Sequence, residues 1–432
     1  MSKQIYKDKF YTHFDKKKYH TNYEQSVQNI NWVSRHGFYP FIHFQMDCSK
    51  YTNDLEGNKS IKEKNRDIYY AAHIDRFIYE YYGNRLNSKY NNYMKSKGIG
   101  RVSTAYRNCS PGKCNIDFAK EVFEYIAKCE SAYIFVGDFS KFFDNLDHRY
   151  LKEKIKCVVD EKSLDVADYA IYKNITKFTY VEADDIEAQK GLFRRDMREL
   201  DKYFETDEFH DFKKKHLHKN SKDYQIPQGS SISAVYANIY MIDFDKRIND
   251  FITSQKGIYR RYCDDIIVVI PMTRNEINCG RNEEISKFIY DTRDGIPNLK
   301  LNEDKTEHFF YNNGEIEKIK GQSNLINYLG FTFDGRIVHI RDKSLFKFYC
   351  RVYRKIKRIK ENTDEKSFNA GKKAIYHSYT HLGASKYSKD HGNFLTYAYK
   401  ADEIFSQSKV LESGIRNQVK RHWYKIDSKL KE

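Results

Sequence analysis

The chain has 432 residues, of which 40% are hydrophobic, 16% aromatic and 31% charged, and its net charge is +16. This apolar content excludes an intrinsically disordered chain, because enough side chains can be buried to offset the entropy lost on folding. The longest purely aliphatic run, Ile266 to Ile270, has five residues, far short of the roughly 20 that span a bilayer. Residues 1–10 are basic and have no apolar segment. We therefore expect a cytoplasmic protein without a secretory signal or a membrane partner.

The N-terminal residues 1–59 are polar and aromatic, and no motif in them indicates a chemistry. Residues 66–93 and 116–129 carry apolar side chains at helical spacing and predict helices. Cys109 and Cys114 lie between these two segments. A single C-x4-C pair lacks the second pair of ligands that a structural zinc site needs, so we expect two ordinary loop cysteines.

A short apolar strand is predicted over 132–137, and it ends at Asp138. Residues 182–208 are acidic, with arginines among the acids, and predict an exposed helical face. Within them, Asp184 and Asp185 form a paired carboxylate with no predicted strand leading into it. We expect that pair to be solvated and without chemistry, so it serves as an internal control.

Pro227-Gln228-Gly229 predicts a turn, and an apolar helix is expected from Ile232 to Phe244. Residues 258–270 are almost continuously apolar or aromatic, which is typical of a β-hairpin, and its tip carries Asp264 and Asp265. A last strand is predicted over 328–333.

The C-terminal residues 341–432 contain 22 basic and 10 acidic side chains, a net charge of +12, whereas the preceding 340 residues carry only +4. Their first helix has an apolar stripe at spacings of four and three, formed by Leu345, Tyr349, Val352, Ile356 and Ile359. Arginines and lysines cover most of its remaining surface. We expect this helix to pack its stripe on other helices and to present its basic face to phosphates. Binding of this helix to a membrane surface is the alternative, but the sequence has no companion lipid anchor.

Three acids, Asp138, Asp264 and Asp265, lie at the ends of predicted strands. An uncompensated charge at the end of a buried strand is costly, and a divalent cation removes that cost. Mg²⁺ binds one or two carboxylates together with substrate phosphates. Two such ions, roughly 3.5–4 Å apart, activate an attacking hydroxyl and stabilise the leaving oxygen. The acids therefore predict phosphoryl transfer with two Mg²⁺ ions, or with Mn²⁺ in their place.

The order of motifs over residues 62–335 resembles the catalytic core of reverse transcriptases, in the form shared by bacterial and group II intron enzymes. The matching segments are Gly137–His148, Ile226–Ser233, Tyr262–Asp265, Leu301–Thr306 and Tyr328–Phe331, preceded by Arg66–Ile68, Asp75–Arg76 and Ala105–Arg107. The resemblance implies an α+β right-hand polymerase. Its expected parts are an N-terminal extension (1–59), fingers (60–130), a palm with a small antiparallel sheet (131–340), an acidic helical insertion in the palm (about 149–225) and a helical basic thumb (341–432).

The resemblance also implies a role for each matched residue. Asp138 and Asp264 would hold both metal ions, with Asp265 beside them, and Lys305 would donate a proton to pyrophosphate unless it is an ordinary surface lysine. The expected substrate-binding residues are Arg66 and Arg107 for the triphosphate, Phe143 as a gate against the ribose 2′-hydroxyl unless it is a core residue, and Gln228 and Gly229 for the nascent base pair. The expected nucleic-acid contacts are Tyr262, Leu329, Gly330, Arg354, Lys355, Arg358 and Lys360.

We therefore expect an RNA-directed DNA polymerase that uses dNTPs and an RNA template to make cDNA. The chain lacks the N-A-x-x-H and V-T-G motifs of retron enzymes, and its Tyr262–Asp265 motif and residues 382–397 are more similar to the defence-associated reverse transcriptases of bacteria. That resemblance implies antiphage immunity, often with a structured non-coding RNA from the same locus. Three alternatives stay open: a retron-like or other bacterial reverse transcriptase without a defence role, an RNA-templated RNA polymerase, and an inactive RNA-binding protein. The sequence specifies neither the primer nor the oligomeric state.

Overall fold

The computed structural model describes residues 8–17, 19–53, 59–107, 111–361, 364–383 and 392–432, and it describes no side chains for residues 47–64. The chain forms two compact units. The first unit contains Met1–Cys109, Ser140–Lys246 and Thr292–Lys300, and the second contains Ser110–Phe139, Arg247–Asp291 and Leu301–Glu432. No helix among the described residues is both long enough and apolar enough to cross a membrane. Cys109 lies outside the described residues, so the cysteine prediction is tested only at Cys114, a half-buried free thiol.

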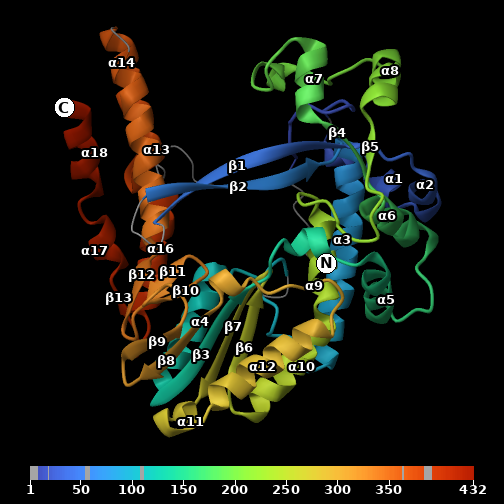
Figure 1. The fold of residues 1–432 in the computed structure, drawn as a ribbon. Helices are drawn as coiled ribbons and strands as arrows, with labels where there is room; N and C mark the ends of the chain where they lie inside the picture. The colour runs from blue at the N-terminus through green and yellow to red at the C-terminus, as the bar shows by residue number, and fades with distance from the viewer. Residues whose placement is uncertain (1–7, 18, 54–58, 108–110, 362–363, 384–391) are drawn as a thin grey trace. The chain divides into compact units, whose positions relative to one another are not determined.

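The first unit has a four-stranded sheet in the order β2-β1-β4-β5 (Figure 1). Its main part is a long antiparallel hairpin of β1 (Phe41–Asn53) and β2 (Lys59–Tyr70). The short strands β4 (Thr179–Glu182) and β5 (His218–Lys219) extend the sheet, β4 running parallel to β1. The prediction of helix from residue 66 is therefore wrong at its start, because residues 66–70 complete β2 and the helix begins only at His73.

The helices of the first unit gather around α3 (His73–Ser96), which packs along α9 (Ser231–Tyr240). This group also includes α1 (Glu24–Gln28), α2 (Ile30–Arg35), α5 (His148–Val159) and α6 (Val166–Thr176), with the 3-10 turns η1 (His20–Asn22) and η2 (Phe142–Asn145). The helix predicted from Ile232 to Phe244 is in fact two, because the chain breaks at Met241 before α10 (Ile242–Ser254), within which the second unit resumes.

A small separate core stabilises the acidic segment of the first unit. Residues 182–208 do not form the single exposed helical face that was predicted, because α7 (Ala183–Lys190) and η3 (Asp196–Glu199) bury apolar side chains and α8 (Thr206–His216) follows. The buried members include Ile186, Met197, Tyr203 and Phe204. Strand β4 does lead into Asp184 and Asp185, contrary to expectation, and both lie in the first turn of α7. Asp184 is 94% exposed, in agreement with its role as a control.

The second unit contains a five-stranded sheet in the order β6-β7-β3-β8-β9 (Figure 1). The strands are β3 (Ser131–Asp138), β6 (Ile258–Tyr262), β7 (Asp265–Pro271), β8 (Glu307–Asn312) and β9 (Glu315–Lys320), all antiparallel to their neighbours. The predicted strand before Asp138 and the predicted hairpin over 258–270 are both confirmed. Helix α4 (Asn115–Lys128) shares a hydrophobic core with β3, β7 and β8. The remaining helices, α11 (Arg274–Asn278) and α12 (Arg281–Asp294), follow β7 in the sequence.

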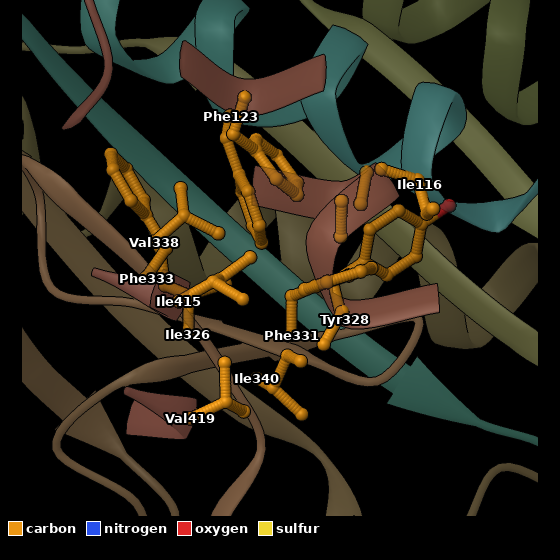
Figure 2. Packing of buried hydrophobic residues seen from close by; sticks show 14 of the residues in the cluster. Ile116, Phe123, Ile326, Tyr328, Phe331, Phe333, Val338, Ile340, Ile415 and Val419 are labelled. Atoms are coloured by element: carbon orange, nitrogen blue, oxygen red, sulfur yellow. The ribbon is translucent and has the colours of Figure 1, made fainter. Parts of the chain in front are cut away.

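A second sheet of this unit has the order β10-β11-β12-β13. Its strands are β10 (Ile326–Tyr328), β11 (Phe331–Phe333), β12 (Ile337–Ile340) and β13 (Glu412–Ser413). The single strand predicted over 328–333 is instead a hairpin, because Leu329 and Gly330 have φ angles of 48° and 91°, as in a two-residue type I′ turn. Figure 2 shows the core beneath it, where Phe333 stacks on Phe123 of α4 with ring centroids 4.9 Å apart.

The helices of the C-terminal region are α13 (Asp342–Lys360), α14 (Glu365–Tyr379), α16 (Phe394–Ser406), α17 (Ile415–Val419) and α18 (His422–Lys431). The predicted amphipathic helix is confirmed as α13, which buries Val352, Ile356 and Ile359. Its apolar side is wider than predicted, because Phe348 is also buried while Leu345 and Tyr349 are only partly buried against the same core.

Candidate active site

The register of the five-stranded sheet brings two predicted acids together. Asp138, the last residue of β3, lies directly opposite Asp265, the first residue of β7. Asp264 lies in the two-residue turn between β6 and β7, since Tyr262 pairs with Asp265. Cys263, the first turn residue, has a φ of 59°, and a positive φ at this position is typical of the tight turns that join twisted strands. The sequence therefore places three carboxylates at one end of adjacent strands, as expected.

Backbone hydrogen bonds hold this end of the sheet in place. The amide of Phe139 donates to the carbonyl oxygen of Asp264 at 3.1 Å, and the amide of Asn302 donates to that of Asp138 at 2.8 Å. Phe139 also forms an isolated β-bridge with Leu301. Three segments that are far apart in the sequence thus meet at the acids through main-chain contacts, which do not depend on the carboxylate groups themselves.

The carboxylates lie close enough to repel one another. Burial raises the pKa of Asp264, and the nearby charge of Asp138 raises it further. Burial and the charges of Asp264 and Asp138 raise the pKa of Asp265 to about 7, against the opposing effect of Lys305 and Arg341. Lys305, at the end of η4 (Glu303–Lys305), forms an ion pair with Asp138. The cluster therefore has an excess of negative charge that a cation stabilises.

This donor set fits divalent magnesium. Carboxylate oxygens are the hard ligands that Mg²⁺ prefers, and such sites use one or two carboxylates, leaving the remaining positions to water and substrate phosphates. Within the described ranges no three His, Cys, Asp or Glu side chains are arranged to hold a metal ion together, so the fit rests on the donor chemistry of the carboxylates.

The turn that carries Asp264 has a buried support that sequence reasoning missed. The Arg261 side chain is 0% exposed, and its Nη1 donates to the carbonyl oxygen of Cys263 at 3.0 Å. In the sequence, Arg261 only interrupts the apolar hairpin. Its burial could have been predicted from the alternation of β6, in which Tyr259 and Arg261 point to the buried side.

A cavity of about 290 Å³ opens beside Asp265 and is formed entirely by the second unit. Tyr262, Leu329 and Gly330, three of the predicted nucleic-acid contacts, line this cavity. Asn115 stabilises its wall, since the side-chain amide donates to the carbonyl oxygen of Leu329 at 3.0 Å. The cavity therefore brings the turn at 329–330 and the acidic end of the sheet to one place.

Arg341 contributes the positive charge of this cavity. Its amide donates to the carbonyl oxygen of Gly330 at 3.0 Å, and its Nε donates to Oδ1 of Asn327 at 3.1 Å. The exposed guanidinium lines the cavity and lowers the pKa of Asp265. Sequence reasoning missed Arg341, because in the sequence this residue stands out only as part of the basic charge of the C-terminal region.

The four basic residues predicted on α13 do not have equal surroundings. Arg354, Arg358 and Lys360 are exposed to solvent. Lys355 is half-buried, and its ammonium lies 5.6 Å from the centre of the Tyr379 ring. Three of the four are therefore available to a phosphate backbone, whereas Lys355 also contributes to helix packing.

The predicted triphosphate-binding arginines lie in the first unit. Arg66 is exposed on β2, opposite Met46 of β1. Arg107 is half-buried, with its Nε donating to Asn91 at 2.7 Å and its Nη1 donating to the carbonyl oxygens of Gly100 and Ser103 at 2.6 and 2.8 Å. Arg107 thus stabilises the loop after α3. This role is additional to its predicted role in binding the triphosphate.

The Gln228-Gly229 turn is held against the end of β2. The amide of Tyr69 donates to the carbonyl oxygen of Gln228 at 2.8 Å. Gly229 has a φ of 128°, and a Cβ atom at this position would overlap the carbonyl oxygen of Tyr69. Glycine is therefore required at this position by a close approach to the protein backbone. The prediction for Gly229 included only an approach to a base pair.

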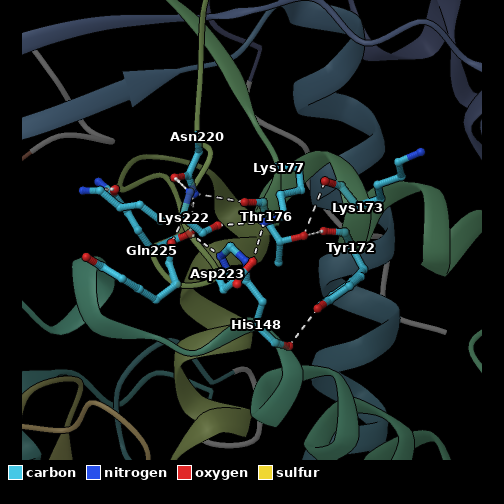
Figure 3. Close-up of polar contacts among 10 residues, drawn as sticks. His148, Tyr172, Lys173, Thr176, Lys177, Asn220, Lys222, Asp223 and Gln225 are labelled. Carbon is cyan, nitrogen blue, oxygen red and sulfur yellow. Dashed lines mark hydrogen bonds and ion pairs between the residues drawn. The ribbon is translucent and has the colours of Figure 1, made fainter.

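A polar network fixes the loop that leads into this turn, as Figure 3 shows. The buried Asn220 donates to the carbonyl oxygens of Thr176 and Tyr224 at 3.0 and 3.2 Å. The His148 ring contacts the carbonyl oxygen of Gln225 at 2.8 Å, and Lys177 donates to Asp223 at 2.8 Å. These bonds connect the loop that precedes Gln228 to α5 and to the end of α6.

Phe143 has an accessible ring next to a buried one. Phe142 is 4% exposed, whereas Phe143 is half-buried. The ring of Phe143 is therefore not a fully buried core residue.

Two acids follow these rings in the sequence. Asp147 caps α5 by accepting a hydrogen bond from the Tyr150 amide at 2.8 Å. Asp144 has other surroundings. Burial raises its pKa, and its carboxylate accepts from Gln225 at 3.4 Å.

Comparisons with known proteins identify the family of the chain. A family model described as "Reverse transcriptase (RNA-dependent DNA polymerase)" matches residues 85–333. Among solved structures, apo telomerase from Candida tropicalis, truncated from its C-terminal domain, has 13% identity and a TM-score of 0.38, with 72% of this chain and 58% of that chain covered. Telomerase from Candida albicans, in complex with a fragment of telomeric RNA, has 10% identity and a TM-score of 0.43, with 94% and 59% covered. The chain thus spans less than two thirds of either telomerase chain. No curated protein matches the sequence.

Proposed function

The chain belongs to the reverse transcriptase family of RNA-directed DNA polymerases, and from this premise we propose that it makes cDNA by two-metal nucleotidyl transfer at Asp138 and Asp264. The observation that carries the proposal is the pairing of Asp138 with Asp265 across adjacent strands, next to the turn that holds Asp264. Residues 85–333, which match the family, include all three acids, Lys305 and the turn at 329–330.

We further propose the division into the parts of a right-hand polymerase that the family implies. In this proposal residues 60–130 are the fingers, 131–340 the palm with an insertion at about 149–225, and 341–432 the basic thumb, after an N-terminal extension of residues 1–59. The five-stranded sheet that carries the acids is the core of the proposed palm.

The proposed chemistry assigns a task to each side chain of the acidic cluster. Asp138 and Asp264 hold two Mg²⁺ ions, which when bound supply activation of the primer 3′-hydroxyl and stabilisation of the leaving oxygen. Asp265 lies beside them, and Arg261 holds the carbonyl of the Cys263 turn so that Asp264 keeps its place. Lys305, 43% exposed and paired with Asp138, is the proposed proton donor to pyrophosphate. The cavity at Tyr262, Leu329 and Gly330 is proposed to hold the primer end, with Arg341 facing its phosphate.

Sugar selection tests the polymerase assignment and separates it from RNA-templated RNA synthesis. With Mg²⁺ and a primed RNA template, the protein is expected to incorporate dNTPs and to reject rNTPs. Phe143→Ala removes the half-buried ring and is expected to reduce this discrimination by about tenfold or more, because loss of a steric contact is worth that much. Relative kcat/KM for dNTPs and rNTPs measures the effect.

The matched control is Phe193→Ala, which removes a ring that is 76% exposed in the same unit, and it is expected to leave discrimination unchanged. Preference for rNTPs in the unmodified protein would favour an RNA polymerase. Absence of incorporation on every template, with RNA binding retained without Mg²⁺, would favour an inactive RNA-binding protein.

The basic face of α13 is proposed to bind the primer–template duplex. Replacing the exposed Arg354, Arg358 and Lys360 by neutral residues is expected to weaken duplex binding. The slope of log affinity against log salt concentration is expected to decrease by about 0.7–0.9 for each phosphate contact that is lost. Lys355→Gln is expected to have a smaller effect on binding, since that ammonium already lies over the Tyr379 ring. Measurement of duplex affinity at several salt concentrations gives both quantities.

Lys318→Gln with Lys320→Gln is the control for this prediction, because it removes charge from the exposed strand β9 of the same unit. An equal loss of affinity per charge in the control variant would mean that binding follows net charge and not the face of α13.

We also propose that the template is a structured non-coding RNA and that synthesis serves antiphage defence. The support is the sequence resemblance at Tyr262–Asp265 and at residues 393–397, where Asn393 caps α16 and the Tyr397 hydroxyl accepts from Asn115 at 2.8 Å. Sequencing the nucleic acid that copurifies with the protein, with and without phage infection, tests both parts. Only host mRNA fragments, unchanged by infection, would count against them.

A further inference from the structure

The first unit contains a groove of about 570 Å³ that none of the proposed catalytic or substrate-binding residues lines. Its walls come from the N-terminal segment, the start of α3, and the residues before and within α8. The groove lies at the edge of the small core that holds Phe14, Phe204 and Phe212. No motif in this N-terminal segment indicates a chemistry, so the proposed polymerase reaction leaves the groove without a function.

Aromatic rings form the apolar part of the groove. Phe14 and Phe204 are buried beneath it, whereas Phe38, Tyr39 and Phe209 are half-buried and line it. The centroids of Tyr39 and Phe209 are 5.8 Å apart, and Phe209 packs on Phe14 at 4.6 Å. Rings that are fixed on one face by such packing, and open on another, are suitable platforms for a stacked base.

The charged residues of the groove are mostly basic. Lys16, Lys202 and Lys213 line it. Lys202 forms an ion pair with Glu205, but within the described ranges Lys16 and Lys213 have no carboxylate partner. The groove thus presents two ammonium groups that are free to bind an anion.

Asp15 is the carboxylate that lines the groove, and hydrogen bonds within the protein compensate its charge. Its two carboxylate oxygens accept hydrogen bonds from the amides of His73 and Ile74, at 3.0 and 2.9 Å, at the N-terminus of α3. The positive end of the helix dipole compensates the carboxylate at this position. Repulsion between Asp15 and an anionic ligand is reduced for the same reason, so the groove is complementary to a polyanion.

We propose that this groove binds single-stranded RNA, with separate bases stacked on Tyr39 and on Phe209, whose rings are tilted by 48° to each other, and phosphates bound by Lys16 and Lys213. The choice of RNA rests on the proposed function, because a reverse transcriptase handles an RNA strand. A single strand is favoured over a duplex, because only unpaired bases expose a ring face to an aromatic platform. The groove then retains a template or partner RNA through a contact separate from the catalytic residues.

The test uses the full-length protein and a photoreactive, unstructured RNA of about 12 nucleotides, within the length that such sites bind. Crosslinking in the unmodified protein is expected within residues 36–40 or 202–213. Lys16→Glu with Lys213→Glu is expected to reduce that crosslink and the RNA affinity by roughly tenfold or more. Lys214→Glu, on the same helix but outside the groove and 77% exposed, is the matched control.

The outcomes separate this proposal from the catalytic one. A crosslink outside these segments, an equal crosslink in the Lys16 and Lys213 variant, or equal competition by double-stranded RNA would overturn the groove proposal. DNA synthesis on a primed template is expected to stay unchanged in that variant. A protein that crosslinks in the groove but synthesises no DNA would keep the groove and overturn the proposed function.

Discussion

Asp264→Asn is expected to reduce DNA synthesis by about a thousandfold or more, because removal of a metal ligand takes away several kcal/mol of transition-state stabilisation. The fold is expected to survive, since the main-chain carbonyl of Asp264, and not its carboxylate, accepts from Phe139. The substitution also removes a negative charge beside Asp138 and Asp265, and this charge raises the pKa of Asp265. The melting temperature without metal is therefore expected to stay equal or to rise, in contrast to the activity.

Asp184→Asn provides the control for this prediction. It changes the same residue type at a paired carboxylate that is 94% exposed and whose contact with Arg194 is 3.4 Å long. Neither synthesis nor melting temperature is expected to change, because an exposed ion pair contributes little. Single-turnover incorporation of a labelled dNTP and thermal unfolding measure the two quantities. Synthesis by the Asp264 variant at more than a tenth of the unmodified rate would mean that Asp264 does not hold the metal ions.

The sequence predicts the acidic end of the sheet well, because local signals and tertiary structure agree there. The run before Asp138 is apolar and largely buried, and the run after Asp264, Ile266 to Ile270, consists of buried β-branched residues. A buried strand needs little else to be recognised. The strand ends were predicted from the local pattern, whereas the convergence of Asp138 with Asp264 and Asp265 was implied by the resemblance to reverse transcriptases. The pairing of Asp138 with Asp265 is a finding of the structure.

Other elements depend on information that the sequence pattern does not carry. The hairpin of β1 and β2 includes the strand sequence from Lys59 to Tyr70, whose lysines, glutamate and arginine give no clear alternation. Leu329 has a positive φ in its turn. Leucine rarely adopts this conformation, so the residue type did not predict the turn. The break at Met241 is set by packing, since Met241 and both of its neighbours are buried. Tertiary contacts decide these three cases.

In the candidate site, too, some residues were predicted from motifs and others were recognised only from their contacts. Motif order identified the acids and the Gln228-Gly229 turn, but the functions of Arg261 and Arg341 became visible only through their contacts with the carbonyl oxygens of Cys263 and Gly330. For Gly229, the residue type predicted a close approach to a base pair, and the structure shows a close approach to the carbonyl oxygen of Tyr69. That difference has a measurable consequence.

Gly229→Ala is expected to destabilise the first unit by about 3 kcal/mol or more, because two costs add. A non-glycine residue at a φ of 128° is strained by roughly 1–3 kcal/mol, and the new Cβ overlaps the carbonyl oxygen of Tyr69. The overlap pushes the turn away from β2 and weakens the bond between the Tyr69 amide and the Gln228 carbonyl oxygen. Hydrogen exchange at Tyr69 and in α3 and α9 is expected to accelerate.

Gly98→Ala is the matched control, since Gly98 has a φ of 74° in the same unit but no atom within 4 Å of the position that a Cβ atom would occupy. That variant carries a smaller backbone strain and no overlap, because a φ of 74° is close to the left-handed region that other residues can adopt. The difference between the two variants therefore contains the contact with Tyr69 and the extra strain at a φ of 128°. We expect the Gly229 variant to be clearly less stable than the Gly98 variant. If both had equal stability while only the Gly229 variant failed to synthesise DNA, the glycine would be required by a bound base pair and not by the packing of the turn against β2.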